Sequence, residues 1–247
     1  QLNVTSQRIL VRVDFNVPIN AGVIGDTTRI AKTVPTLTEL AGRGARVIVL
    51  SHLGRPNGQR SDDLSLQPVA KALSDILGKP VPFATDCVGA EAEQIIGAMQ
   101  DGDIVVMENL RFHPGEEKND AAFARQLSSL ADVYVGDAFS CAHRAHASTE
   151  AIAHLMPSAA GRLMQAELEA LTKALEIPQR PVAALVGGAK ISTKLAVLGH
   201  LVAKVNTLII GGAMANTFLH AQGIDVGKSL CEHEMASQAR DILEKAR

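Results

Sequence analysis

Residues 182–194 read VAALVGGAKISTK, and this order predicts a strand, a glycine turn and the start of a helix. Its first five residues are apolar and have the length of a strand that is buried on both faces. Gly187 and Gly188 allow a sharp turn and the close approach of a ligand, because neither has a Cβ atom. Ser192 is predicted to cap a helix that runs from Thr193 to about Ala203.

The same stretch has features that favour an anion, most often phosphate. Free backbone N–H groups and the positive end of a helix dipole would face one point in space. Lys190 and Lys194 are four residues apart and can reach the same side of the turn. An ordinary strand-to-helix turn with two surface lysines explains these residues equally well. The stretch has neither the GxxxxGK[ST] phosphate loop nor the GxGxxG dinucleotide fingerprint, so the rest of the chain must decide.

The composition indicates a globular protein. The 247 residues can form one large or two small domains, and 47% are apolar while 20% are charged. A net charge of −2 with 3% aromatic residues does not suggest a nucleic-acid binder. Cys87, Cys141 and Cys231 lie far apart, as expected of reduced thiols in a cytoplasmic protein. No apolar run has the ~18 residues of a membrane helix and no signal peptide opens the chain, although Gln1 predicts that the true start is missing.

Apolar runs alternate with helical segments along the whole chain, which predicts an α/β protein with doubly wound parallel sheets. The predicted strands are Arg8–Val13, Arg46–Leu50, Val81–Ala84, Ile104–Met107, Val133–Val135, Val182–Val186 and Thr207–Ile210. The predicted helices are about Ile30–Ala41, Gln67–Leu77, Ala90–Met99, Asp120–Leu130, Thr149–Leu155, Leu163–Leu175, Thr193–Ala203, Ala215–Ala221 and His233–Ala246. Asn119 is a predicted cap, Pro68 fits a first helical turn, and Pro35 predicts a late start or a kink in its helix.

The chain is predicted to divide near a connecting helix. Leucines and alanines recur at helical spacing between Pro157 and Pro181, which indicates a stiff connector instead of a flexible linker. We expect a first domain over residues 1–158, a helix and connector over 159–180, and a second, partial domain over 181–247.

Polar residues follow four predicted strands in the first half of the chain. Parallel strands end at the same edge of a sheet, where such folds bind ligands. The side chains expected to converge there are Arg29, Arg55, Arg111, Arg144, His52 and His143. A guanidinium group matches carboxylate or phosphate oxygens two at a time, so the pattern predicts a small anionic substrate.

Two further features of the sequence bear on the ligand. Asp14 and Asn16 would fix a ligand hydroxyl or orient an arginine, and an internal ion pair that closes their loop is equally consistent with the spacing. No paired-ligand spacing supports a metal site at Asp14 or Asp137.

Gly211 and Gly212 follow another predicted strand, and two glycine turns beside two lysines favour the phosphates and sugar of a nucleotide.

Six stretches together resemble the phosphoglycerate kinase family, of a bacterial type. They are LVRVDFNVP (10–18), SHLGRP (51–56), ENLRF (108–112), DAF with AHRAH (137–139 and 142–146), GGAKISTK (187–194) and GGAMANTF (211–218). The resemblance covers nearly the whole chain in the order and spacing of the family.

The resemblance implies a two-domain glycolytic kinase that moves a phosphoryl group reversibly between 1,3-bisphosphoglycerate and ADP, giving 3-phosphoglycerate and ATP, with Mg²⁺. It implies that phosphoglycerate is held by Asp14, Phe15, Asn16, Arg29, His52, Leu53, Gly54, Arg55, Arg111, His143 and Arg144. It implies that ATP or ADP is held by Gly187, Gly188, Ala189, Lys190, Lys194, Gly211 and Gly212. Lys190 and Arg29 would stabilise the phosphoryl group in flight, and the domains would close over the substrates. The implied partners are these small molecules, with no nucleic acid or membrane, and a monomer is expected.

The sequence also departs from the family. Ser140-Cys141 stands where many members carry Gly-Thr, a change not expected to abolish activity. The sequence ends at Arg247, before further strands, a second phosphate loop and the acidic metal contact of the family, so little or no kinase activity is expected of this chain by itself. The alternative is a non-catalytic phosphate-ester-binding α/β fragment. A nicotinamide dehydrogenase has the same fold class, but the glycine fingerprint of those enzymes is absent from this sequence. A purely structural role leaves the arginines at the strand ends unexplained.

Overall fold

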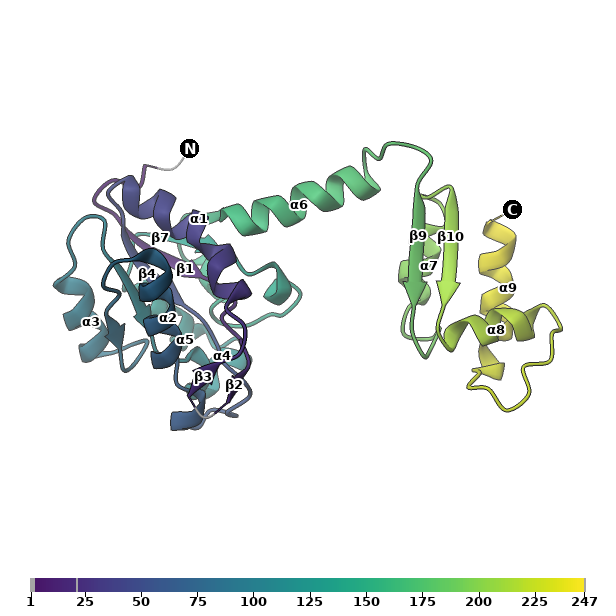
Figure 1. The fold of residues 1–247 in the computed structure, drawn as a ribbon, viewed down its shortest axis with the longest axis horizontal. Coiled ribbons are helices and arrows are strands. Elements are labelled where there is room, and N and C mark those ends of the chain that lie inside the picture. The colour runs from purple at the N-terminus through teal and green to yellow at the C-terminus, as the bar shows by residue number, and fades with distance from the viewer. Residues whose placement is uncertain (1–2, 21, 247) are drawn as a thin grey trace. The chain divides into compact units, whose positions relative to one another are not determined.

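The protein, described over residues 3–20 and 22–246 by a computed structural model, forms two compact units (Figure 1). The first unit comprises Gln1–Glu167 and the second Leu168–Arg247, so the chain divides within helix α6 (Arg162–Leu175). The first unit therefore extends past the expected domain end at residue 158. Gln1 and Arg247, on which expectations about the chain ends were based, lie outside the described residues.

The first unit is built on a six-stranded sheet in the order β5-β6-β4-β1-β7-β8, and all of its strand pairs are parallel. The strands are β1 (Arg8–Arg12), β4 (Arg46–Leu50), β5 (Phe83–Ala84), β6 (Ile104–Met107), β7 (Val133–Gly136) and β8 (Ser158–Ala160). Only β8 was not predicted. Arg12 stands opposite Leu50 in β4 and Gly136 in β7, so the three central strands end at one edge.

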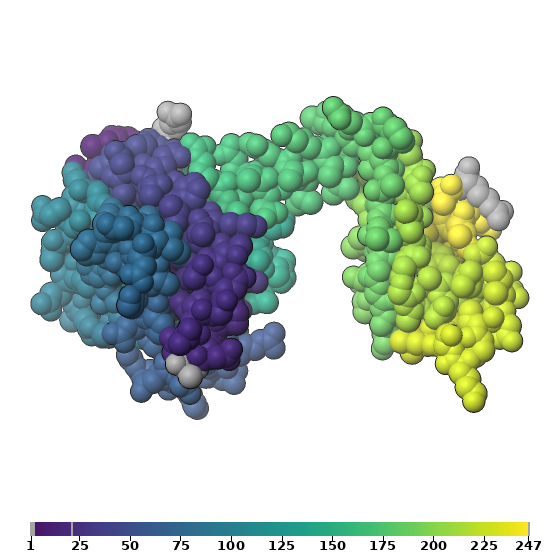
Figure 2. Space-filling view, in the orientation of Figure 1, coloured from purple at the N-terminus to yellow at the C-terminus, as the bar shows by residue number. Residues whose placement is uncertain are grey.

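Helices cover both faces of this sheet, which confirms the doubly wound α/β prediction. Helices α1 (Thr28–Gly42) and α2 (Gln67–Leu77) pack on one face, and α3 (Ala90–Gly97) and α5 (Ala121–Ser128) pack on the other. Along β1, Ile9 and Val11 belong to the first core and Leu10 to the second. Each such buried side chain stabilises the fold by about 1.5–3 kcal/mol relative to an exposed one. Residues around α1 and α2, purple to blue, lie at the surface of the first unit in Figure 2.

Short elements hold the loops of the first unit. They are the antiparallel pair β2 (Ile19–Asn20) and β3 (Val23–Ile24), α4 (Pro114–Glu117), and the 3₁₀ turns η1 (Asp62–Leu64), η2 (Leu110–Phe112), η3 (Phe139–Cys141) and η4 (Ala151–His154). The helix predicted over residues 149–155 is wrong, because only the turn η4 forms there.

Local capping differs from the prediction at the start of α5. The carboxylate of Asp120 accepts a hydrogen bond of 2.8 Å from the backbone N–H of Phe123, so Asp120 caps this helix and Asn119 does not. Asn119 has a left-handed backbone with φ of 53°, and its side chain donates to Glu150. An asparagine tolerates that conformation better than most residues, which explains its place before the cap.

Two of the prolines within helices bear on the predictions. Pro68 occupies the first turn of α2, as predicted, where its missing N–H removes no helical hydrogen bond. Pro35 lies within α1, but this helix begins at Thr28, so the predicted late start is wrong. Asp26 accepts a hydrogen bond of 2.8 Å from the N–H of Thr28 and thereby holds the first turn.

The second unit is smaller and has one core. The parallel strands β9 (Ala183–Gly187) and β10 (Thr207–Gly211) pack with α7 (Leu195–Leu201), α8 (Met214–Ala221) and α9 (Ala236–Lys245), and η5 (His233–Met235) precedes α9. Its core includes Ile191, Leu198, Met214, Phe218 and Ile242. Among the described residues, no helix of either unit has both the length and the hydropathy that a bilayer span requires.

The prediction that Val182–Val186 is buried on both faces is wrong. Leu185 in β9 is 73% exposed, and its partner Ile209 in β10 is 48% exposed. Val186 instead packs against the core. The core lies on one face of these two strands, so alternate apolar side chains point outward, and β9, in green, lies at the surface of the second unit in Figure 2.

Candidate functional site

The carboxyl edge of the first sheet carries the candidate substrate site. After β1 the chain builds β4, β5 and β6 on one side of that strand, and then crosses to build β7 and β8 on its other side. The loops after β1 and β7 therefore flank the point where the winding direction reverses. Open α/β sheets bind ligands at such switch points.

Asp14, directly after β1, organises the loops around it. Arg29 and the hydroxyl of Ser140 both donate to its carboxylate, and the N–H of Asn16 donates at 3.0 Å. Burial alone would raise the pKa of Asp14, but the hydrogen bonds from Ser140 and Asn16 and the charge of Arg29 hold it below its usual value. The internal ion pair that the sequence left open is therefore formed, and Asp14 orients Arg29.

A chain of hydrogen bonds joins the loops after β1, β4 and β6. The side-chain oxygen of Asn16 accepts from the N–H of Gly54 at 2.9 Å, and Arg111 donates to the carbonyl of Gly54 at 2.7 Å. Gly54 has a φ of +61°, and a Cβ atom there would lie 2.7 Å from the side chain of Leu64. Only glycine suits this position, at which two predicted site residues meet the backbone.

His52 is held as a neutral hydrogen-bond donor. Its side chain is buried, and its Nδ1 lies 3.1 Å from Nη2 of Arg12. A guanidinium group can only donate, so Nδ1 accepts and Nε2 carries the proton. Burial, with the charges of Arg12 and Arg111, lowers the pKa of His52 to about 3. His52 is therefore uncharged at neutral pH and can donate from Nε2.

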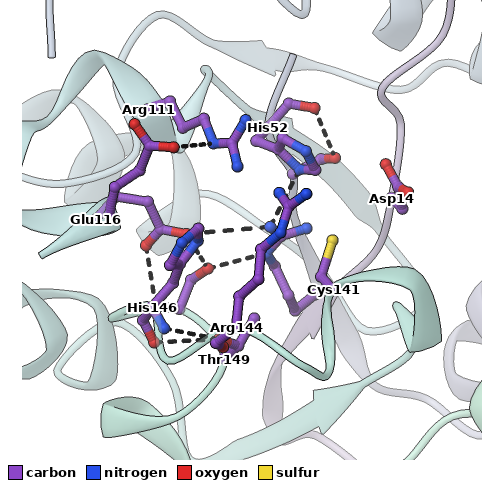
Figure 3. Close-up of polar contacts among 12 residues, drawn as sticks. Asp14, His52, Arg111, Glu116, Cys141, Arg144, His146 and Thr149 are labelled. Atoms are coloured by element: carbon purple, nitrogen blue, oxygen red, sulfur yellow. Dashed lines mark hydrogen bonds and ion pairs between the residues drawn. The ribbon is translucent and has the colours of Figure 1, made fainter. Parts of the chain in front are cut away.

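Behind His52 lies a buried polar network (Figure 3). Arg12, only 1% exposed, donates from Nε to the hydroxyl of Ser148 at 2.9 Å. The same hydroxyl donates to Glu116 at 2.6 Å, and Glu116 lies 4.0 Å from Arg12. The buried positive and negative charges are thus paired and hydrogen-bonded, as burial of charge requires.

Arg144 completes the cleft from the loop after β7. Figure 3 shows its side chain extending toward His52, and its charge acts on both His52 and Arg111. Its Nε lies 3.4 Å from Nε2 of His143, which is exposed. Arg55 is also exposed and forms no ion pair with the described residues. The arginines of four loops therefore lie along one edge of the sheet.

The glycine turns of the second unit lie side by side. Gly187 stands opposite Gly211 in the register of β9 and β10. Gly212 has a φ of +70°, and a Cβ atom there would lie 2.7 Å from the carbonyl oxygen of Gly188. A Cβ atom on Gly188 would lie 2.9 Å from Cε of Lys194. The two turns therefore form one surface of bare backbone beneath a lysine.

Comparisons with known proteins agree with this geometry. A family model described as phosphoglycerate kinase matches residues 1–247. The chain belongs to the phosphoglycerate kinase family.

Curated phosphoglycerate kinases show the same relationship in detail. The protein from Rhodopseudomonas palustris is 60% identical over 245 residues, which cover 99% of this chain and 61% of that protein. The protein from Rhodospirillum centenum is 62% identical, with 99% and 62% covered. A solved phosphoglycerate kinase from Coxiella burnetii has a TM-score of 0.89 and 43% identity, with 99% and 62% covered. The chain thus spans about three fifths of the length of the relatives it matches.

Two of the predicted phosphoglycerate contacts have side chains in the core. Phe15 is fully buried, and its N–H donates to the hydroxyl of Ser51 at 2.8 Å. Leu53 is 3% exposed. The side chain of Asn109 accepts a hydrogen bond from the N–H of Leu53 and donates one to its carbonyl oxygen. These side chains shape the loops without lining the cleft, and their contact with substrate stays a prediction.

Two cavities adjoin the basic edge. One of about 200 Å³ is lined by Asp14, Arg29 and Ser140 among others. Another, of about 710 Å³, is lined in part by Arg12, His143 and Arg144. The predicted contacts Asn16, Arg55 and Arg111 lie outside both linings. The candidate site is therefore an open edge with two adjoining hollows.

Asp137, at which no ligand spacing supported a metal site, makes a contact with helix α6. It is fully buried and accepts a hydrogen bond of 2.9 Å from the N–H of Met164 at the start of α6. Burial raises its pKa above the usual value. A Cβ atom on Gly161 would lie 2.3 Å from Asp137, so the glycine makes room for this contact.

The predicted cap at Ser192 is wrong. Helix α7 begins at Leu195. The N–H and the hydroxyl of Ser192 both donate hydrogen bonds to the carboxylate of Glu232, at 3.1 and 2.7 Å. The N–H groups of the turn are therefore not all free for a ligand. Helix α7 has only seven residues, so its dipole adds less than predicted. Lys190 and Ala189 are exposed beside this turn.

Three residues of the candidate sites were not predicted from the sequence: Arg12, Glu116 and Glu232. Arg12 lies inside a strand with apolar neighbours on both sides, which is itself a signal, because a buried arginine needs a partner. Glu116 and Glu232 are brought in from distant segments, and no local pattern marks them.

Proposed function

We propose that this chain forms the phosphoglycerate site and part of the nucleotide site of a phosphoglycerate kinase, which moves a phosphoryl group reversibly between 1,3-bisphosphoglycerate and ADP. The observation that carries the proposal is the fixed Nε2–H of His52 beside Arg111 and Arg144 at the switch point of the sheet. Neutral and cationic donors together suit a ligand that has both oxyanions and a hydroxyl group.

Each side chain has a role that follows from its partners. Arg144 and the exposed Arg55 keep donors for the phosphate and carboxylate oxygens of 3-phosphoglycerate. Arg111 has Nη1 on the carbonyl of Gly54 and Nε 3.2 Å from Glu117, so Nη2 remains to face the ligand. Asn16 accepts from Gly54 through its oxygen, so its amide NH₂ remains to donate. Asp14 holds Arg29 and can accept from the ligand hydroxyl.

The reaction needs charge stabilisation more than proton transfer. A β-phosphate oxygen of ADP attacks the phosphorus of the acyl phosphate, and the bond from phosphorus to the carboxylate oxygen breaks. The leaving carboxylate is stable at neutral pH, so no general base or acid is required. Phosphoryl transfer then depends on positioning and on cations near the moving group. We assign this role to Lys190 and to Arg29.

The second unit is proposed to hold the phosphates of ATP or ADP. Gly188 and Gly212 leave backbone uncovered where any Cβ atom would collide, and Lys194 crosses that surface. Mg²⁺ would supply further charge neutralisation when bound with the nucleotide. The proposed nucleotide contacts are glycine, alanine and lysine, so none of their side chains is a ligand for Mg²⁺.

A non-catalytic phosphate-ester-binding protein is the second candidate. The exposed apolar face at Leu185 and Ile209 and the small core of the second unit favour it. Turnover separates the two functions, because binding alone would leave ATP formation from 1,3-bisphosphoglycerate and ADP at the uncatalysed level.

Calorimetric titration of this chain with 3-phosphoglycerate at low salt tests the substrate site. We expect one-to-one binding that weakens about 10–100-fold in Arg144→Ala, because a charge-assisted contact contributes about 1.5–3 kcal/mol. The matched control is Arg125→Ala, since Arg125 is exposed on α5 away from the loops. Equal affinities for the two variants would remove Arg144 from the site.

A further inference from the structure

A cluster of three potential metal ligands lies in the first unit, outside the linings of the two cavities beside the basic edge. Asp86 and Cys87 follow β5, and His113 follows η2. One carboxylate oxygen, the Cys87 sulfur and one ring nitrogen all lie within 4.8 Å of one another. We propose that Asp86, Cys87 and His113 bind a borderline-soft divalent cation of the Zn²⁺ class, a site separate from the proposed kinase chemistry.

The donor set suits this class of cation. Thiolate, imidazole and carboxylate together are typical ligands of Zn²⁺, whereas Mg²⁺ and Ca²⁺ prefer oxygen alone. Cys87 is 1% exposed, and Asp86 and His113 are partly exposed, so the sulfur lies inside while the other two ligands face the surface. A cation could therefore enter past Asp86 and His113 and reach the sulfur.

The ligands are already oriented toward one another. Nε2 of His113 lies 2.7 Å from Oδ1 of Asp86, and the N–H of Cys87 donates to the same oxygen at 2.6 Å. The ring of His113 stacks on Phe123 with 4.9 Å between centroids. A tetrahedral Zn²⁺ site needs about 3.3 Å between nitrogen and oxygen ligands, so a small opening of the Asp86–His113 pair would admit the ion.

The charge around the cluster also favours a cation. The carboxylates of Asp86, Glu116 and Glu108 place negative charge near the Cys87 sulfur. Carboxylates that disfavour a bare thiolate favour a metal-bound one. On binding, the cation displaces the thiol proton, which passes to solvent, and forms a bond to sulfur. His113 binds through Nε2 as a neutral imidazole that keeps its single proton on Nδ1.

An open coordination position would remain. A cavity of about 140 Å³ is lined by Asp86, His113, Glu108 and Arg60 among others. It is large enough for a water molecule as the fourth ligand. The bound cation would join the loop after β5 to the segment that follows Arg111, and would stabilise the fold of the first unit.

A second cluster of this kind among the described residues does not fit a cation. Asp14, His52 and Cys141 also have ligand atoms within 4.8 Å. However, Arg12 donates to Nδ1 of His52, so Nε2 carries a proton and has no lone pair for a metal. The arginines of the basic edge add repulsion. In the Asp86 cluster, no described residue is hydrogen-bonded to Nδ1 of His113, so the ring proton can occupy Nδ1 and leave Nε2 for the ion. Arg60 lines the adjoining cavity, but its charge is paired with Glu108 at 3.7 Å.

Titration of the whole chain with Co²⁺, followed by absorption, tests the site. A cysteine ligand gives a thiolate-to-cobalt charge-transfer band, and added Zn²⁺ should remove the band by displacement. We expect the band in the unmodified chain and in Cys231→Ser, the matched control in the second unit, and its loss in Cys87→Ser. The proposal is overturned by a folded chain that gives no band, or by a band that persists in Cys87→Ser.

His113→Gln gives an independent test if Cys87→Ser does not fold. It keeps the thiol and should weaken Co²⁺ binding more than about tenfold, since losing a ligand costs at least as much as losing a supporting contact. Fluorescence of Tyr134, the single tyrosine, in β7 reports folding of the first unit in each variant. Unchanged Co²⁺ affinity in a folded His113→Gln variant would also overturn the site.

Discussion

The two units use the same strand, turn and helix pattern but hold their candidate sites differently. In the first unit, six strands with helices on both faces bury Arg12 and His52, and side chains tie the loops together. In the second unit, two strands with one core leave Leu185 exposed, and the glycine turns are held by contact between backbones. The difference teaches that similar local sequence gives a preorganised polar site only where neighbouring elements bury it.

Loss of the buried charge network should have the largest effect. Replacing Arg12 by methionine leaves Glu116 buried without its cation, and we expect a loss of about 3–5 kcal/mol in the free energy of unfolding of the first unit. Urea unfolding followed by Tyr134 fluorescence measures it. Arg125→Met, on an exposed position, should change stability by less than about 0.5 kcal/mol. Similar values for the two variants would mean that the network does not stabilise the first unit.

A pair of leucine substitutions tests the difference in burial. Leu10→Ala in β1 removes a fully buried side chain and should cost about 2–5 kcal/mol. Leu185→Ala in β9 removes a side chain that is 73% exposed and should cost less than about 0.5 kcal/mol. Urea unfolding of each variant, followed by circular dichroism, gives both values. A large loss for Leu185→Ala would show that the face of β9 is covered in solution.

A pair of glycine substitutions separates backbone contact from backbone conformation in the second unit. Gly212 and Gly223 both have positive φ, but only at Gly212 would a Cβ atom meet other atoms, the backbone of Gly188. We expect Gly223→Ala to cost about 1 kcal/mol and Gly212→Ala about 1–3 kcal/mol more, with loss of ADP binding. Thermal unfolding and ADP titration check both. If Gly212→Ala retains ADP affinity, the turns are not the phosphate surface.

The pH dependence of stability should report His52. Its pKa is lowered from 6.5 to about 3 in the folded chain, so below about pH 6.5 the unfolded chain binds a proton that the folded chain does not. Stability is therefore lost as pH falls toward 3, by up to about 1.4 kcal/mol per pH unit from this residue. His52→Gln should flatten the slope between about pH 5 and 6.5, whereas His154→Gln, an exposed control, should not. An unchanged slope in His52→Gln would refute the neutral state.

Much of the fold could be predicted from the sequence, because local patterns carry it. The strand Arg46–Leu50 was predicted at its observed bounds, since its last four residues form the continuous apolar run that is typical of a strand buried on both faces. The same reasoning failed at Val182–Val186, because an apolar run does not reveal how many neighbours its strand has. The pattern gave the type of element and left its burial undetermined.

The loop residues of the candidate site could be predicted from the sequence, whereas the distant residues that hold them in place could not. The arginines that follow strands could be placed at one edge because parallel strands end together. The partners of Arg12 and Ser192 could not, because Glu116 and Glu232 reach them across distant parts of the chain.

Hydrogen exchange of this chain, with and without 3-phosphoglycerate, tests most directly the claim that the first unit contains a preorganised site by itself. We predict slower exchange in residues 14–16, 51–55, 109–112 and 140–149, and unchanged exchange in residues 183–214. Ligand binding to a preformed site raises the opening free energy of the elements around it. A folded chain in which none of the four loops is protected at saturating ligand would contradict the account.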